Sequence, residues 1–160
     1  MARWHKLPTL AAAGLLALPG GAAAQPAFTE APVTAPMVLA ALDICTRQVR
    51  AGTFDSAELT GAGWVLAIRA DGETVIRGYR HPDNMILLTT FDKRTDPDEC
   101  RIIAPTGRGL TIHQMHAALE QRMGGQATAV AGQAVWTPEG VRLAMRPLSD
   151  VGVVIEVTPR

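Results

Sequence analysis

The chain has 160 residues, of which 48% are hydrophobic, and its 15 basic residues balance its 15 acidic ones. That length and apolar content suit one packed domain. A balanced charge gives no electrostatic basis for binding nucleic acid or an anionic membrane surface.

The first 24 residues predict a secretory signal peptide. Arg3 and Lys6 precede an apolar stretch, and the segment ends in the small residues 22–24. A spanning helix is the alternative, but prolines and a glycine pair interrupt a run that is already short for a bilayer. Cleavage after Ala24 would leave Gln25 first, with 13 basic and 15 acidic residues, and would send the protein to the periplasm or outside the cell. After cleavage no membrane span is expected.

Cys45 and Cys100 are the two cysteines of the chain. An even cysteine count in an exported protein favours a disulfide, since such compartments are oxidising. The alternative is a zinc site that combines both thiolates with His113 and His116, but this spacing matches no common zinc finger.

An extended leader is expected over residues 25–35, followed by a single domain over residues 36–160. The domain begins with a helix whose C-terminal cap is Gly52. Apolar residues recur on it at helical spacing and predict one stripe facing the core. The stripe consists of Val38, Leu42, Cys45 and Val49.

Strands dominate the middle of the chain. Asp71-Gly72 predicts a two-residue type I′ turn between strands, because both central residues of that turn need positive φ. Further strands are expected over residues 84–91 and 99–105. The turn would fix a register with three cross-strand pairs: Trp64 with Tyr79, Leu66 with Arg77, and Ile68 with Val75.

A second helix is predicted to start at Thr111, which forms a capping box with Gln114. Leu110 and Met115 fit the hydrophobic staple that often accompanies such a box. A hairpin over residues 133–145 and a strand over 151–157 follow, the latter with Val151 on its buried face. The order predicts an α+β fold: an antiparallel sheet of five to seven strands packed on two helices, with one disulfide and no visible internal repeat.

Three polar residues of the second helix stay unexplained by capping or packing. His113, His116 and Glu120 are neighbours at helical spacing, and two imidazoles with a carboxylate suit a divalent metal ion. The alternative is an ordinary helix in which His116 lies beside Glu120 and His113 faces solvent.

Gly107, Arg108 and Gly109 precede the same helix. Free backbone amides, the positive end of the helix dipole and a guanidinium together suit an anion. The third glycine of a dinucleotide fingerprint is missing, so a plain strand-to-helix turn is the alternative.

No convincing catalytic set emerges. Neither Ser56 nor Ser149 has the context of a nucleophile elbow, and a disulfide would consume both thiols. The sequence therefore predicts a non-catalytic binding or accessory protein for an unidentified protein or small molecule, without a cofactor. A metal protein or hydrolase-type enzyme that uses His113, His116 and Glu120 is the alternative.

Overall fold

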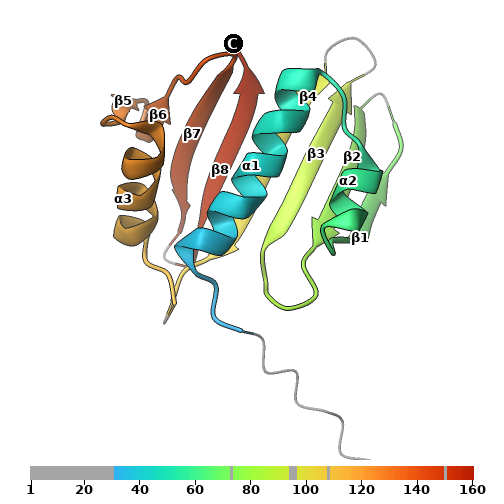
Figure 1. Ribbon diagram of the computed structural model, residues 1–160, viewed down its shortest axis with the longest axis horizontal. Coiled ribbons are helices and arrows are strands. Elements are labelled where there is room, and N and C mark those ends of the chain that lie inside the picture. Colours follow the sequence, from blue (N-terminus) through green and yellow to red (C-terminus); the bar gives the residue numbers. More distant parts are fainter. Residues whose placement is uncertain (1–30, 73, 94–96, 108, 150) are drawn as a thin grey trace, which may run out of the picture.

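The protein, described here by a computed structural model, is an eight-stranded antiparallel sheet with three helices on one face (Figure 1). The structure describes residues 31–160 except 73, 94–96, 108 and 150, so the predicted signal peptide and most of the leader lie outside it. The predicted α+β class is confirmed, but both element counts were too low. The helices are α1 Ala35–Ala51, α2 Ser56–Gly61 and α3 Ile112–Met123; the strands are β1 Val65–Ala70, β2 Thr74–Arg80, β3 Leu87–Lys93, β4 Pro97–Pro105, β5 Thr128–Val130, β6 Gln133–Trp136, β7 Val141–Leu148 and β8 Gly152–Pro159.

The strand order is β1-β2-β3-β4-β8-β7-β6-β5, which divides the sheet into two halves. The first half is α1 and α2 followed by β1–β4, and the second is α3 followed by β5–β8. In each half the four strands pair in chain order, and the last strands of the halves, β4 and β8, pair at the centre. The helices α1 and α3 both start after a threonine, Thr34 or Thr111, and share Ala-Ala-Leu followed by an acidic residue at 40–43 and 117–120. The architecture is thus repeated, although the sequence shows no overall repeat.

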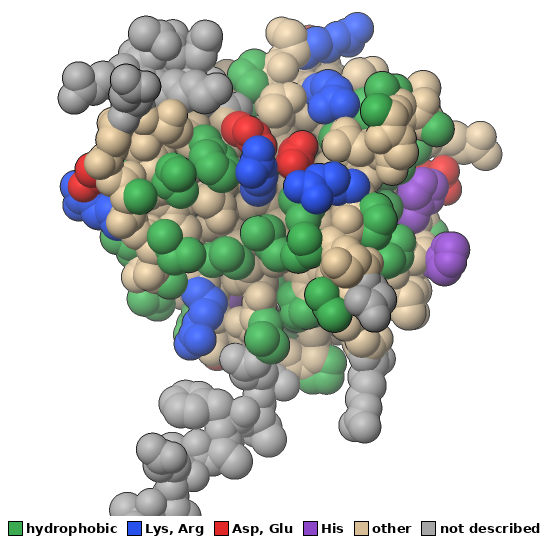
Figure 2. Space-filling model, turned by 180° about the vertical axis from the view of Figure 1, so that it is seen from behind, with side chains coloured by type: hydrophobic (Ala, Val, Ile, Leu, Met, Phe, Trp, Pro, Cys, Tyr) green, Lys and Arg blue, Asp and Glu red, His purple; other side chains and the backbone are tan. Residues whose placement is uncertain are grey.

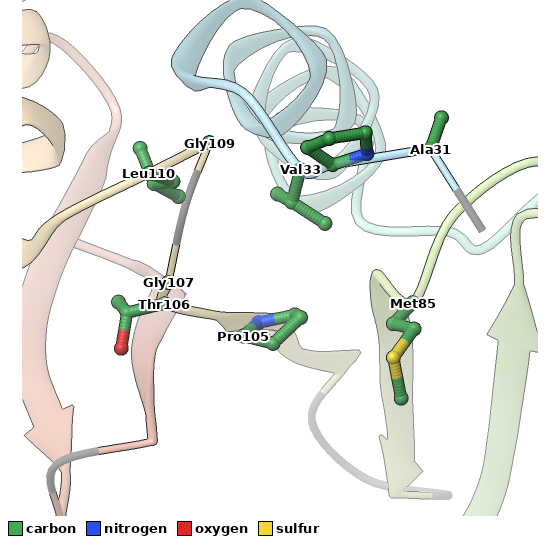
Figure 3. A pocket seen from close by; sticks show the side chains of 9 residues that line it. Ala31, Val33, Met85, Pro105, Thr106, Gly107, Gly109 and Leu110 are labelled. Carbon is green, nitrogen blue, oxygen red and sulfur yellow. The ribbon is translucent and has the colours of Figure 1, made fainter. Parts of the chain in front are cut away.

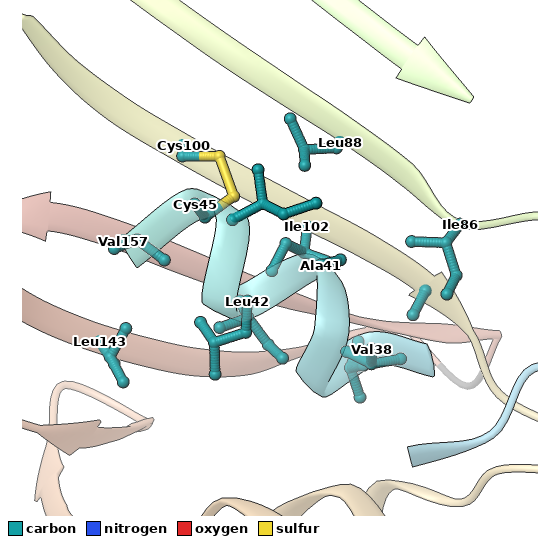
Figure 4. Packing of buried hydrophobic residues seen from close by; sticks show 14 of the residues in the cluster. Val38, Ala41, Leu42, Cys45, Ile86, Leu88, Cys100, Ile102, Leu143 and Val157 are labelled. Carbon is teal, nitrogen blue, oxygen red and sulfur yellow. A yellow bond between two sulfur atoms is a disulfide. The ribbon is translucent and has the colours of Figure 1, made fainter. Parts of the chain in front are cut away.

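Helix α1 crosses the middle of the sheet and supplies the centre of the core (Figures 1 and 4). It ends where Gly52 adopts a left-handed conformation with φ 65°. Its predicted apolar stripe is confirmed, because Val38 and Cys45 are fully buried and Leu42 and Val49 nearly so. At about 25 cal/mol per Å² of apolar surface, such burial is the main favourable term in folding.

A disulfide joins α1 to the central strand β4, as the sequence predicts. Cys45 and Cys100 are bonded, with their Cα atoms 5.6 Å apart. Both side chains are fully buried, and Cys100 lies between Thr90 of β3 and Val157 of β8. The bridge fixes the helix at one position over the sheet and excludes the alternative zinc site, which needs both thiolates.

The predicted register of the β1–β2 hairpin was wrong. Ala70 pairs with Ile76 and Ile68 with Gly78, so the connection is longer than a two-residue turn and the pairing is offset by three residues from the predicted one. A bulge between Leu66 and Ile68 then shifts the pairing by one residue, so that Leu66 pairs with Tyr79. A Cβ on Gly78 would lie 2.9 Å from that of Ile68, so only glycine allows this approach. Trp64 lies outside the strand and is nearly buried, and its backbone N–H donates to the Leu59 carbonyl at 3.0 Å.

The C-terminal half starts as predicted but differs from the prediction in two places. The capping box of Thr111 and Gln114 is present. A hairpin that the sequence did not predict, β5–β6, turns at Ala131 and Gly132, which both have positive φ. Val151 was expected on the buried face of the last strand, but it precedes β8 and is 61% exposed.

The short helix α2 is held against α1 by polar contacts. The guanidinium of Arg47 donates two hydrogen bonds to the Glu58 carboxylate, at 3.0 and 2.5 Å. These bonds hold the pKa of Glu58 below its ordinary value of 4.5, against the opposing effect of burial. The nearly buried Gln48 donates to the Asp55 carbonyl at 2.9 Å and to Glu58 at 3.2 Å.

No helix among the described residues is long and apolar enough to cross a membrane.

Removal of the disulfide should strongly destabilise the fold. The bridge closes a loop with a sequence separation of 55, so the double variant Cys45→Ala/Cys100→Ala should lose about 4 kcal/mol of unfolding free energy by chain entropy. Urea denaturation measures this loss. A loss under about 1 kcal/mol would show that the bridge adds little beyond the packing of α1.

The contact between α1 and α2 should depend on pH. Because the pKa of Glu58 is lowered, its ionised form stabilises the fold above pH 4.5, and this contribution disappears as the pH falls through the lowered value. Glu58→Gln should therefore unfold more easily than the native protein at pH 7, by less than about 1 kcal/mol for this partly exposed pair, and equally in strong acid. Thermal melts across pH test this, with Glu139→Gln as the control; a constant difference would contradict it.

Candidate functional site

The broadest candidate site is the sheet face opposite the three helices, called the open face below (Figure 2). Strand side chains alternate between the two faces, so Cys100, Ile102 and Ala104 of β4 point into the core while Arg101 and Ile103 point the other way. Figure 2 shows hydrophobic side chains across this face beside a cluster of both charges. The open-face residues that matter below are Arg80, Leu87, Phe91, Glu99, Arg101, Ile103, Arg142, Ala144, Arg146, Val154 and Glu156.

An apolar row crosses the centre of the open face. Leu87, Ile103 and Val154 are direct cross-strand neighbours on β3, β4 and β8. Arg80 pairs with Leu87 at one end of the row, and Arg146 pairs with Val154 at the other. Leu87 and Ile103 are half-buried, so their side chains remain accessible. Val154 is buried, with 2% of its surface exposed, so the accessible apolar surface of the row is that of Leu87 and Ile103. An arginine flanks each end of the row.

A network of charged side chains lies next to the apolar row. Glu156 accepts from Arg146 at 3.3 Å and lies 3.5 Å from the guanidinium of Arg101. Arg101 also pairs with Glu99, and its guanidinium lies 4.5 Å from the centre of the Phe91 ring. These long side chains lie along the sheet rather than extending into water, so the network shields apolar surface that no helix covers.

The open face carries more positive than negative charge. Arg80 and Arg142 make no ion pair among the described residues, and Arg142 contacts only the Gln133 amide, at 3.5 Å. Among the described strand side chains of this face, four arginines stand against the two glutamates Glu99 and Glu156. The excess is notable because the chain without its predicted signal peptide is slightly acidic.

Helix α3 does not unite the three candidate metal ligands. His116 lies 3.7 Å from Glu120, and its ring packs against Trp136 with centroids 5.4 Å apart. His113 is exposed and lines a separate surface hollow with Leu110 and Thr111. Within the described part of the chain, no three His, Cys, Asp or Glu side chains lie close enough together to hold a metal ion. Packing against Trp136 explains His116 without a metal.

The candidate anion site before α3 is only partly visible. Arg108 lies outside the described residues, and the Gly107 N–H already donates to the Leu110 carbonyl at 2.8 Å. A Cβ on Gly109 would lie 2.5 Å from the Val33 carbonyl oxygen, so this glycine lets the end of the leader pass over the loop. Nothing in these contacts favours an anion over a plain strand-to-helix turn.

A small apolar cavity lies between that loop and the end of the leader (Figure 3). Its volume is about 270 Å³, and Val33, Met85 and Pro105 are among its lining residues. Ligand pockets usually hold at least about 300 Å³ and contain several convergent polar groups. The cavity is thus a weaker candidate than the open face, although Met85 is 57% exposed at its rim.

An exposed sheet face could be expected from the sequence as a possible interface, but which face is exposed could not. Its residues sit on strands that were largely predicted, yet alternation alone does not tell which side the helices cover. The β1–β2 register error hid a further part of this face, because the bulge turns Ile68 over Gly78. Comparison with known proteins adds no relation: no family model, curated protein or solved structure matches the chain.

Substitutions of His116 can separate packing from metal binding. His116→Ala should lose about 0.5–1.5 kcal/mol of stability because the ring contact with Trp136 disappears, whereas His116→Phe should keep most of it. Urea denaturation and elemental analysis of the purified proteins measure both properties. Stoichiometric zinc in the native protein that is absent from both variants would instead assign His116 as a ligand.

Proposed function

We propose that this protein is an exported, non-catalytic binding protein that holds a protein partner on its open face. The observation that supports this most directly is the accessible apolar surface of Leu87 and Ile103, which lies in a cross-strand row flanked by Arg80 and Arg146. An apolar centre with polar surroundings is the usual anatomy of a protein interface. Contiguous apolar surface on a folded domain commonly marks such a contact.

The dimensions of the open face also suit a macromolecule. The six longest strands, β1–β4, β8 and β7, lie side by side, so five spacings of about 4.8 Å span roughly 24 Å, and their six to nine residues are about 20–30 Å long. The product is comparable with the roughly 800 Å² that each partner contributes to a typical stable interface. A small substrate would instead require an enclosed pocket.

Export is part of the proposal and rests on two features. The first 24 residues have the composition of a signal peptide. The Cys45–Cys100 bridge is compatible with an oxidising compartment, where structural disulfides form and persist. A rigid, disulfide-stabilised scaffold would suit an accessory protein that works outside the cytoplasm.

Site-specific photo-crosslinking in the producing cell tests the proposal. A photoreactive residue at position 103 should give a discrete protein adduct, because this side chain lies in the apolar row. The same residue at position 40, exposed on the outer side of α1, is the matched control and should give none. Absence of an adduct from position 103, or identical adducts from both positions, would refute a binding role for the open face.

A further inference from the structure

We infer that the partner of the open face is an acidic amphipathic protein segment, with apolar side chains between carboxylates. This inference rests on the proposed function and adds the chemistry of the partner. It follows from the charge of the face and from the spacing of its arginines.

The charge of the open face favours an acidic partner. Arg80 and Arg142 have no carboxylate partner among the described residues, and Glu156 is shared between Arg101 and Arg146. Binding of carboxylates would satisfy these guanidiniums with charge-assisted hydrogen bonds. A second copy packed face to face would place arginines against arginines, and like charges across an interface cost affinity.

The spacing of the arginines sets the size of the partner segment. Arg80 on β2 and the arginines of β7 are separated by four strand spacings, with β3, β4 and β8 between them. Four spacings amount to about 19 Å. A helix covers that distance in about 13 residues. The segment should therefore carry acidic residues about three to four helical turns apart, with an apolar stripe between them that packs on Leu87 and Ile103.

Binding of designed peptides to the signal-free protein with its disulfide intact provides the test. The first helical peptide carries a leucine stripe between two pairs of glutamates about 19 Å apart. The control peptide is identical except that lysines replace the glutamates. Fluorescence anisotropy should show binding of the acidic peptide and none of the basic one. The affinity should fall as salt is raised, because charged contacts are screened.

Two charge-matched double variants locate the contact. Arg80→Gln/Arg142→Gln should weaken binding of the acidic peptide about tenfold, since these two guanidiniums of the open face have no carboxylate partner among the described residues. Neither change leaves a glutamate of the network without its arginine. Arg47→Gln/Arg122→Gln removes the same charge on the helix side and should leave binding unchanged. Circular dichroism confirms that all variants are folded.

The remaining outcomes each overturn the inference. Equal binding of both peptides, binding of neither, or binding insensitive to Arg80 and Arg142 would refute an acidic partner. Self-association in sedimentation that Ile103→Lys abolishes would assign the face to a second copy. Binding to phosphatidylglycerol vesicles in preference to the acidic peptide would assign it to a membrane. Because the crosslink from position 103 is independent of partner charge, these results leave the proposed binding role separately testable.

Discussion

The fold depends on the burial of one stripe of α1 against the centre of the sheet. Val38, Leu42 and Val49 fill the space above β4 and β8, and the bond from Cys45 to Cys100 fixes the helix there. Because α1 covers the two strands at which the halves of the sheet meet, its packing supports both halves at once. The other two helices cover the flanks of the same face, so among the described elements only side chains cover the opposite face (Figure 1).

Charged side chains, rather than another described helix or strand, therefore cover the open face. Glu156 and its arginine partners lie along the strands and shield part of the apolar surface, while Leu87 and Ile103 stay accessible. Such a surface is stable in water, but binding a partner would also be favourable. A partner would offer direct contacts to the weakly paired guanidiniums and would bury the partly exposed apolar groups. The proposed binding role and the preference for carboxylates are two consequences of this single arrangement.

Features set by neighbouring residues were predictable from the sequence, and features set by distant contacts were not. The caps at Gly52 and Thr111 and the pairing of the two cysteines follow from local geometry and from composition. The β1 bulge depends on the fit of Ile68 over Gly78, a contact between strands that no local pattern encodes. The turn at Ala131 was missed because alanine rarely adopts positive φ. For the candidate site, most open-face residues were in predicted strands, although Arg80 and Arg146 each lie one residue beyond a predicted strand end. Their exposure is decided by which side of the sheet the helices cover.

Both cysteines belong to the first half of the fold, α1 to β4, and this has a consequence for the order of assembly. Every element that the bridge joins is complete by residue 105, whereas the central pairing of β4 with β8 needs residues up to 159. Under the proposed export, the bond can close while the second half is still arriving. The first half would then present the free edge of β4 as a template on which β8 completes the sheet.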